Sequence, residues 1–149
     1  MRITKCVEKG EVVVNMFAGI GCFSILIAKH SCVQKVFSID INPAAYRYQI
    51  ESIRLNRVYD KIVPLLGDSK LIIEGRLHGL ADRVLMPLPE KAFDYISFAL
   101  LALRNTAGWI HYYDFEHAQK NEDPVEKVEH KAVSKLKSLG VQFDVSFGR

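Results

Sequence analysis

Two glycines and two aspartates, each close behind an apolar run, are the residues of this sequence best placed to do chemistry. Gly19 and Gly21 form a Gly-x-Gly turn after the apolar run 12–14, where glycines let the backbone approach a ligand without a Cβ in the way. Asp40 follows Gly21 by 19 residues, a spacing at which a carboxylate can accept hydrogen bonds from both hydroxyls of a ribose. Asp68 follows a third apolar run, where it can meet the edge of an adenine. Together these residues predict a nucleoside crevice, although each aspartate by itself could equally be a helix N-cap.

The residue three positions after the second glycine helps to distinguish between nucleotide ligands. A pyrophosphate-binding turn needs glycine or alanine there so that the helix packs closely, whereas this chain has Ser24. A ligand without phosphates demands less of the turn. S-adenosylmethionine, which offers a ribose for Asp40, an adenine for Asp68 and a methionine tail for the glycine turn, is therefore the expected cofactor. A nicotinamide dinucleotide is the alternative.

Alternating strands and helices must position these residues. Residues rich in β-branched and aromatic side chains predict short strands at 12–15, 36–39, 62–65, 83–86, 109–113 and 143–147. Segments of helical period begin at the pairs Asn42-Pro43, Pro89-Glu90 and Asp123-Pro124, which are typical helix starts. This alternation predicts an α/β fold with a mostly parallel, doubly wound sheet, which binds its ligand beyond the carboxyl ends of the strands.

Composition places the chain among ordinary globular proteins. With 149 residues, 49% of them hydrophobic, it is long enough for one domain with a proper core. No run approaches the roughly 18 apolar residues of a membrane helix. Three cysteines without a Cys-x-x-Cys pair favour a reducing compartment, so we expect a cytoplasmic protein. The histidines have no partnering cysteine pair, and no metal is expected.

Four stretches carry a family resemblance: NMFAGIGCFSI at 15–25, SIDINPAAYRYQIESIRLNRV at 38–58, LLGDS at 65–69 and RVLMPLPEKA at 83–92. In order and spacing they resemble the catalytic domain of the archaeal and eukaryotic tRNA (guanine-37-N1)-methyltransferases, whose close relatives take part in wyosine formation. The resemblance implies a class I, Rossmann-like methyltransferase fold and S-adenosylmethionine as donor. It also implies that the acceptor is the base at position 37 in the anticodon loop of a tRNA.

The resemblance also implies roles for particular residues. Those that hold the donor are Phe17, Gly19 and Gly21 at its methionine portion, Asp40 and Ile41 at its ribose and adenine, and Asp68 and Ser69 at the adenine side. The loop Pro87-Leu88-Pro89 corresponds to the family's loop at the substrate base.

Three departures from the family pattern bear on the chemistry. Asn15 stands where the family usually has aspartate, which removes a charged partner for the donor's ammonium group. Pro87 replaces the asparagine of an Asn-Leu-Pro loop, so the amide that could bond the base is missing and selectivity for N1 stays open. The family's proton acceptor precedes the segment that corresponds to Arg2-Ile3, so the sequence leaves the catalytic residue unassigned.

We expect residues 1–149 to be a single methyltransferase catalytic domain, without the family's N-terminal tRNA-binding domains and without the C-terminal hairpin strand that usually completes the sheet. An open edge at the predicted strand 109–113 would favour self-association.

The sequence thus predicts an S-adenosylmethionine-dependent tRNA methyltransferase acting on N1 of guanine, or on a guanine-derived base, at position 37. Besides a nicotinamide-binding module, two alternatives stay open. One is an aminocarboxypropyl transferase of wyosine biosynthesis that uses the same donor, and the other is a non-catalytic module that binds an adenosine ligand.

Overall fold

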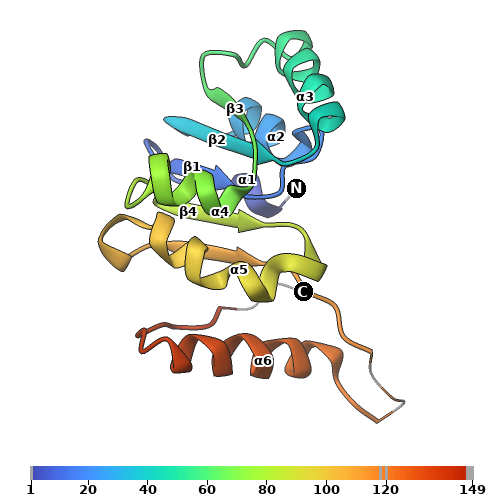
Figure 1. Cartoon of the computed structure of the whole chain (residues 1–149), viewed down its shortest axis with the longest axis vertical. Helices are drawn as coiled ribbons and strands as arrows, with labels where there is room; N and C mark the ends of the chain where they lie inside the picture. Colours follow the sequence, from blue (N-terminus) through green and yellow to red (C-terminus); the bar gives the residue numbers. More distant parts are fainter. Residues whose placement is uncertain (1, 118, 120, 147–149) are drawn as a thin grey trace.

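A parallel β-sheet forms the centre of the computed structural model, which describes residues 2–117, 119 and 121–146 (Figure 1). Its strands are β1 (Val12–Asn15), β2 (Lys35–Asp40), β3 (Ile62–Leu66), β4 (Arg83–Met86) and β5 (Trp109–Tyr112). They lie in the order β3-β2-β1-β4-β5, and every neighbouring pair is parallel. After β3 the chain returns to the other side of β1, so the strand order reverses between β1 and β4. The carboxyl ends of these two strands therefore mark the place where such sheets bind ligands.

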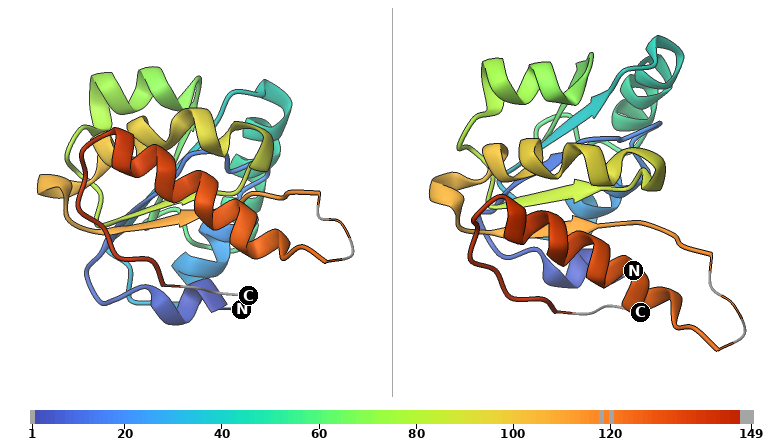
Figure 2. Two further views of the ribbon diagram at one scale, coloured as in Figure 1. Left: turned by 90° about the horizontal axis from the view of Figure 1, so that it is seen from below. Right: turned by 60° about the horizontal axis from the view of Figure 1, so that its bottom comes forward.

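Helices cover both faces of this sheet (Figures 1 and 2). They are α1 (Arg2–Cys6), α2 (Cys22–His30), α3 (Pro43–Leu55), α4 (Ser69–Ile72), η1 (Ile73–Leu77), α5 (Pro89–Ala102), η2 (Arg104–Thr106) and α6 (Pro124–Ser138). Val14 and Val84 pack in one core with η1 and α5, whereas Val13 and Leu85 pack in a second core with α1 and α2. Neighbouring residues of one strand are thus buried in opposite cores, which confirms the predicted α/β, doubly wound fold.

The helix starts predicted from proline are also confirmed. Asn42 and Asp123 cap α3 and α6, since the side-chain oxygen of each accepts a hydrogen bond from the N–H two residues further on, at 2.9 Å and 2.8 Å. α5 begins at Pro89 without a side-chain cap. α6 lies alongside α5, at the opposite end of the molecule from α3 (Figure 1).

The strand predicted at 143–147 is wrong. Residues 143–146 form no strand, and residue 147 lies outside the described residues. Asp144 and Val145 are exposed, so this segment does not add to the sheet. A short alternating run forms a strand only when a neighbouring strand supplies its hydrogen bonds. β5 ends at Tyr112 and is an outer strand of the described sheet.

Candidate functional site

The glycine turn follows β1 at the carboxyl edge of the sheet. Gly19 and Gly21 have backbone φ angles of 57° and 88°, in the left-handed region that residues with a Cβ rarely adopt. A Cβ built on Gly21 would lie 3.0 Å from Cγ of Gln49, whereas one on Gly19 would meet no atom within 4 Å. Gly21 is therefore needed for the packing of the turn, and Gly19 borders open space.

Asp40 joins the end of β2 to this turn. Its Oδ2 accepts a hydrogen bond from the backbone N–H of Gly19 at 2.6 Å, and its Oδ1 accepts one from Asn42 at 2.9 Å. The amide of Gln49 donates to the carbonyl oxygen of Gly19 at 3.1 Å. An ionised carboxylate has about four acceptor positions, so two positions of Asp40 are used by no described residue.

Asp68 reaches from the end of β3 to α5. Its Oδ1 accepts a hydrogen bond from the backbone N–H of Lys70 at 2.9 Å and so caps α4. The hydroxyl of Tyr95 donates to the same carboxylate, 3.2 Å from Oδ1 and 3.3 Å from Oδ2. The backbone N–H of Gly67 donates to the carbonyl oxygen of Asp40 at 2.9 Å. The three predicted loops therefore form one hydrogen-bonded unit.

Apolar side chains flank the two carboxylates. Ile41 is 68% exposed and Leu66 is 47% exposed, and Leu66 lies opposite Asp40 in the register of β2 and β3. A nucleoside has apolar faces on its base and polar groups on the base edge and the ribose. Exposed apolar side chains beside free carboxylate positions suit such a ligand.

Ser24 belongs to a buried polar cluster behind the turn. The amide nitrogen of Asn15 donates to the Ser24 hydroxyl at 3.1 Å, and the hydroxyls of Ser24 and Ser38 are 2.7 Å apart. All three side chains are fully buried. The hydroxyl at position 24 thus bonds to β1 and β2, which an alanine or glycine could not do.

Buried oxygen atoms without a hydrogen-bond partner in the described part of the chain lie in the same loops and behind them. They are Oδ1 of Asn15, Oε1 of Gln49 and Oγ of Ser69. Buried polar groups are normally paired. The predicted donor has an ammonium group, a ribose and an aminopurine, all of which can donate hydrogen bonds. The chain offers these groups the unpaired acceptors, the open space at Gly19 and the unused acceptor positions of Asp40 and Asp68.

Sequence analysis missed Gln49 and Tyr95 as parts of this unit. Gln49 is fully buried, four residues before the buried Ile53 of α3. A polar residue at this spacing on a buried helix stripe is a pattern that could have revealed it. Tyr95 has no such pattern, because its partner Asp68 is 27 residues away in the sequence.

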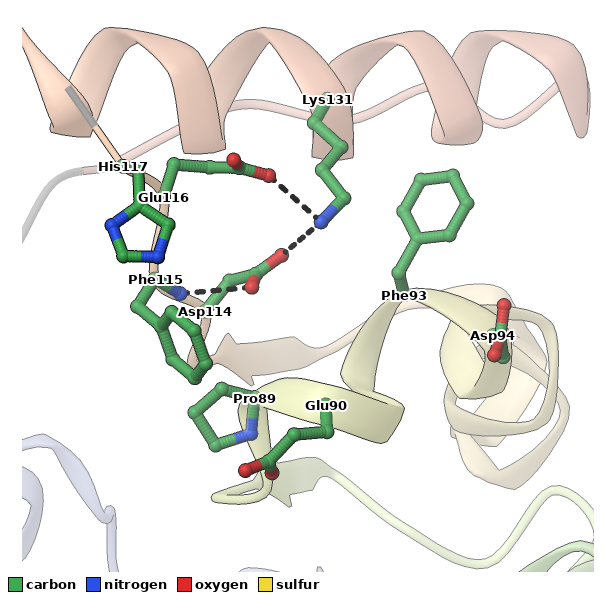
Figure 3. Close-up of a pocket in the computed structure, with 9 residues that line it drawn as sticks. All are labelled: Pro89, Glu90, Phe93, Asp94, Asp114, Phe115, Glu116, His117 and Lys131. Atoms are coloured by element: carbon green, nitrogen blue, oxygen red, sulfur yellow. Dashed lines mark hydrogen bonds and ion pairs between the residues drawn. The ribbon is translucent and has the colours of Figure 1, made fainter. Parts of the chain in front are cut away.

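A pocket of about 380 Å³ lies on the side of β4 and β5 (Figure 3). The residues that line it come from the start of α5, the segment after β5, and α6: Pro89, Glu90, Phe93, Asp94, Asp114, Phe115, Glu116, His117 and Lys131. Pro89 belongs to the predicted base loop, and Pro87 and Leu88 are half-buried just before it. No residue of the glycine turn lines this pocket, although the two loops begin side by side, since the backbone N–H of Met16 donates to the carbonyl oxygen of Leu85 at 3.0 Å.

Lys131 forms ion pairs with two of the pocket's carboxylates. Its Nζ lies 3.0 Å from Oδ2 of Asp114 and 3.1 Å from Oε1 of Glu116 (Figure 3). Burial acts to raise the pKa of Asp114, but hydrogen bonds from Tyr112, Lys131 and its own loop outweigh burial and hold that pKa below its usual value. Glu90, by contrast, makes no ion pair or side-chain hydrogen bond with a described residue.

A second charged cluster lies at the amino edge of the sheet, away from the crevice. Arg83 is 2% exposed, and its Nε and Nη2 lie 2.7 Å and 2.8 Å from the two carboxylate oxygens of Glu11. Its Nη2 also donates to the carbonyl oxygen of Cys6 at 2.6 Å, and its Nη1 lies 2.8 Å from Nε2 of His111. Burial and, after it, the charge of Arg83 lower the pKa of His111 to about 4. This cluster holds α1 and β5 to β4.

Neither a metal centre nor a membrane helix is found in the described part of the chain. None of its groups of histidine, cysteine, aspartate and glutamate could hold a metal ion with three or more ligands. No helix there is long and apolar enough to cross a bilayer.

Residues 1–141 match the model of a protein family described as the TRM5/TYW2 methyltransferase domain. The chain belongs to this family. The tRNA (guanine(37)-N(1))-methyltransferase Trm5b of Pyrococcus abyssi is 45% identical over 115 residues, which are 77% of this chain and 32% of that protein. The tRNA(Phe) (4-demethylwyosine(37)-C(7)) aminocarboxypropyltransferase of Methanocaldococcus jannaschii is 38% identical over 107 residues, 72% of this chain and 41% of that protein.

A solved TRM5/TYW2 structure has the same fold. The crystal structure of M. jannaschii TYW2 in complex with AdoMet superimposes with a TM-score of 0.72 at 35% identity, covering 90% of this chain and 59% of that one. The family and the methyltransferase fold predicted from the sequence are thereby confirmed. This TRM5/TYW2 domain spans less than half the length of the two relatives named above.

Proposed function

We propose that this chain is an S-adenosylmethionine-dependent tRNA methyltransferase domain that acts on N1 of guanine, or on a guanine-derived base, at position 37. The observation that carries the proposal is the hydrogen-bonded unit of three loops at the switch point of the sheet, in which Asp40 bonds to the backbone of Gly19 and of Gly67, and Asp68 follows Gly67. Similarity to Trm5b and to TYW2 in complex with AdoMet supports the choice of donor and acceptor.

We assign the donor contacts by the chemistry of each loop. Phe17, Gly19 and Gly21 border the methionine portion, Asp40 accepts hydrogen bonds from the ribose hydroxyls, and Ile41 covers a face of the adenine. Asp68 and Ser69 accept hydrogen bonds at the adenine edge. The donor supplies an electrophilic methyl group on its sulfonium, and the chain contributes by holding that group in line with the acceptor nitrogen.

The acceptor base is assigned to the side of β4. Pro87, Leu88 and Pro89 follow this strand, and Pro89, Phe93 and Phe115 give the adjacent pocket apolar walls. Pro87 has no N–H and offers the base only its carbonyl oxygen. Guanine carries a proton on N1 at neutral pH, so transfer to this atom needs a proton acceptor within hydrogen-bond reach. Glu90 lines the pocket without an ion pair among the described residues, which makes it the candidate on this chain.

A second candidate function uses the same donor site. The relative from M. jannaschii is named an aminocarboxypropyltransferase, and an enzyme of that kind transfers a different group of the same sulfonium. The contacts of Asp40 and Asp68 would be the same in both reactions. The mass of the modified nucleoside separates the two.

Calorimetric titration with S-adenosylmethionine tests the donor site first. Wild-type protein should bind the donor, and Asp40→Ala should weaken binding at least about 100-fold, because it removes two hydrogen bonds to a charged acceptor at about 1.5 kcal/mol each or more. Asp60→Ala, at an exposed aspartate outside the crevice, is the matched control. Affinity for a nicotinamide dinucleotide, with none for the sulfonium donor, would refute the assignment.

Incubation of the protein with donor and tRNA tests the reaction. A methyl adduct on base 37 supports the main proposal, and an aminocarboxypropyl adduct supports the second. Donor binding without any product on full-length tRNA would leave a non-catalytic binding module and contradict both.

Self-association and location in the cell stay predictions. β5 presents an unpaired edge in the described sheet, so we propose that two copies can pair there, which light scattering across a concentration series would detect. The cytoplasmic location rests on the three cysteines, which form no Cys-x-x-Cys pair.

A further inference from the structure

Tyr95 lies on α5, outside the three loops that follow β1, β2 and β3, and it contacts two of these loops. Its hydroxyl donates to the carboxylate of Asp68 at 3.2 Å and 3.3 Å from the two oxygens. Its ring stands edge-on to Phe17 of the glycine turn, with centroids 5.2 Å apart and planes at 70°. One side chain thus contacts the first loop with its ring and the third loop with its hydroxyl.

The contacts of Asp68 show what the hydroxyl adds. The backbone N–H of Lys70 bonds to Oδ1 alone, which leaves the carboxylate free to turn about that oxygen. The hydroxyl of Tyr95, nearly equidistant from Oδ1 and Oδ2, fixes the plane of the group. Oδ2 receives only a share of this one hydrogen and keeps a lone pair for a ligand.

The ring of Tyr95 is itself held in place. Phe17 contacts it on one side, and Phe98, one helical turn further along α5, lies 5.9 Å away between centroids. Burial and the neighbouring Asp68 raise the pKa of the Tyr95 hydroxyl, so it stays protonated and acts as a donor. A phenylalanine at this position would keep both ring contacts and lose only the hydrogen bond.

We propose that Tyr95 is a positioning residue that sets the purine specificity of the donor site: by fixing Asp68, it directs a carboxylate lone pair at the exocyclic amino group of a 6-aminopurine. A 6-oxopurine presents an acceptor oxygen at the same place, which the carboxylate repels. The inference rests on the proposed function, because it requires Asp68 to lie at the adenine edge.

The test compares two ligands that differ at this one position of the purine. S-adenosylhomocysteine and S-inosylhomocysteine are titrated into wild type, Tyr95→Phe, Asp68→Asn and the double variant. Wild type should prefer the adenine ligand by about 100-fold or more, since a site that bonds an amino group rejects a ligand lacking it. Tyr95→Phe should reduce this preference about tenfold, which corresponds to one hydrogen bond to a charged group.

The double variant separates positioning from packing. If Tyr95 acts through Asp68, the preference of Tyr95→Phe/Asp68→Asn should equal that of Asp68→Asn alone, because the hydroxyl then has no carboxylate to orient. Tyr48→Phe is the matched control, since Tyr48 is 57% exposed and its hydroxyl makes no hydrogen bond with a described residue. Circular dichroism of each variant verifies that it is folded.

The outcomes separate this inference from the proposed function. Wild type that binds the adenine ligand, with an unchanged preference in Tyr95→Phe or an equal loss of affinity for both ligands, would overturn the role of Tyr95 alone. Wild type that binds neither ligand would overturn the donor site and the inference together. If the two single substitutions reduce the preference for the adenine ligand additively in the double variant, Tyr95 acts independently of Asp68, and the inference is also overturned.

Discussion

Mild acid should destabilise this domain through His111. Arginine has only donors, so Nε2 of His111 accepts the hydrogen bond from Arg83 and the folded imidazole is neutral. The groups around the ring are the guanidinium of Arg83 and the carboxylate of Glu11, and burial and Arg83 lower the pKa of His111 from 6.5 to about 4. Between these two values the unfolded chain binds a proton that the folded chain does not. The free energy of unfolding therefore falls as the pH drops from 6.5 towards 4, and it is insensitive to this group above 6.5.

The pKa values give the size of this effect. Linkage between pKa 6.5 and about 4 amounts to about 2 kcal/mol between pH 7 and pH 5. Because the ring is only half-buried, screening by solvent reduces this figure to about 1 kcal/mol.

Urea unfolding at pH 7, 6 and 5 measures the effect. The single tryptophan, Trp109, is a local probe, since the guanidinium of Arg83 lies 5.6 Å from its ring centroid. His111→Gln is the comparison, because its amide oxygen can accept the same hydrogen bond without titrating. Wild type should lose about 1 kcal/mol more stability than His111→Gln between pH 7 and pH 5. Equal losses in the two proteins would refute the reasoning.

Three further predictions concern the crevice and the pocket. Gly21→Ala should lower the free energy of unfolding more than Gly19→Ala in urea titrations, because both backbones are left-handed but only the Cβ at position 21 meets Gln49; equal costs would contradict this. Asn15→Asp should tighten calorimetric binding of S-adenosylmethionine about tenfold, by giving the donor's ammonium group a charged partner, and should lower the melting temperature of the free protein, since an unpaired buried charge is costly. Weaker binding would place the ammonium group elsewhere. Glu90→Gln should slow methyl transfer to tRNA by about 100-fold or more and leave the dissociation constant of the donor unchanged, and an unchanged rate would assign the proton acceptor to another residue.

Residues with a local cause could be predicted from the sequence. Gly19 and Gly21 follow from the left-handed turn after β1, and the starts of α3 and α6 follow from an N-cap residue before proline. The placement of Asp40 follows from the parallel topology, because strands of such a sheet end at the same edge. In each case the physical reason lies within a few residues of the chain or in the order of the strands.

Contacts between distant parts of the chain could not be predicted. The ion pair of Arg83 with Glu11 joins residues 72 positions apart, and nothing in the run around Arg83 distinguishes a buried arginine from one at a strand end. The strand predicted at 143–147 failed for a related reason, since pairing depends on a neighbour that local alternation does not specify. The pocket beside α6 likewise depends on how Lys131 meets Asp114 across the fold.

In the assignment proposed above, the order of the strands divides donor and acceptor between separate stretches of the chain. The residues assigned to the donor lie between positions 15 and 69, whereas those assigned to the acceptor begin at Pro87. Under this assignment, substitutions after β4 can change which base is modified while the donor loops keep their sequence. A substitution in one stretch then needs no second substitution in the other to preserve function. Tyr95 lies after β4 but contacts Phe17 and Asp68 in the donor loops. A substitution of Tyr95 that is selected for a new acceptor would therefore also change donor binding.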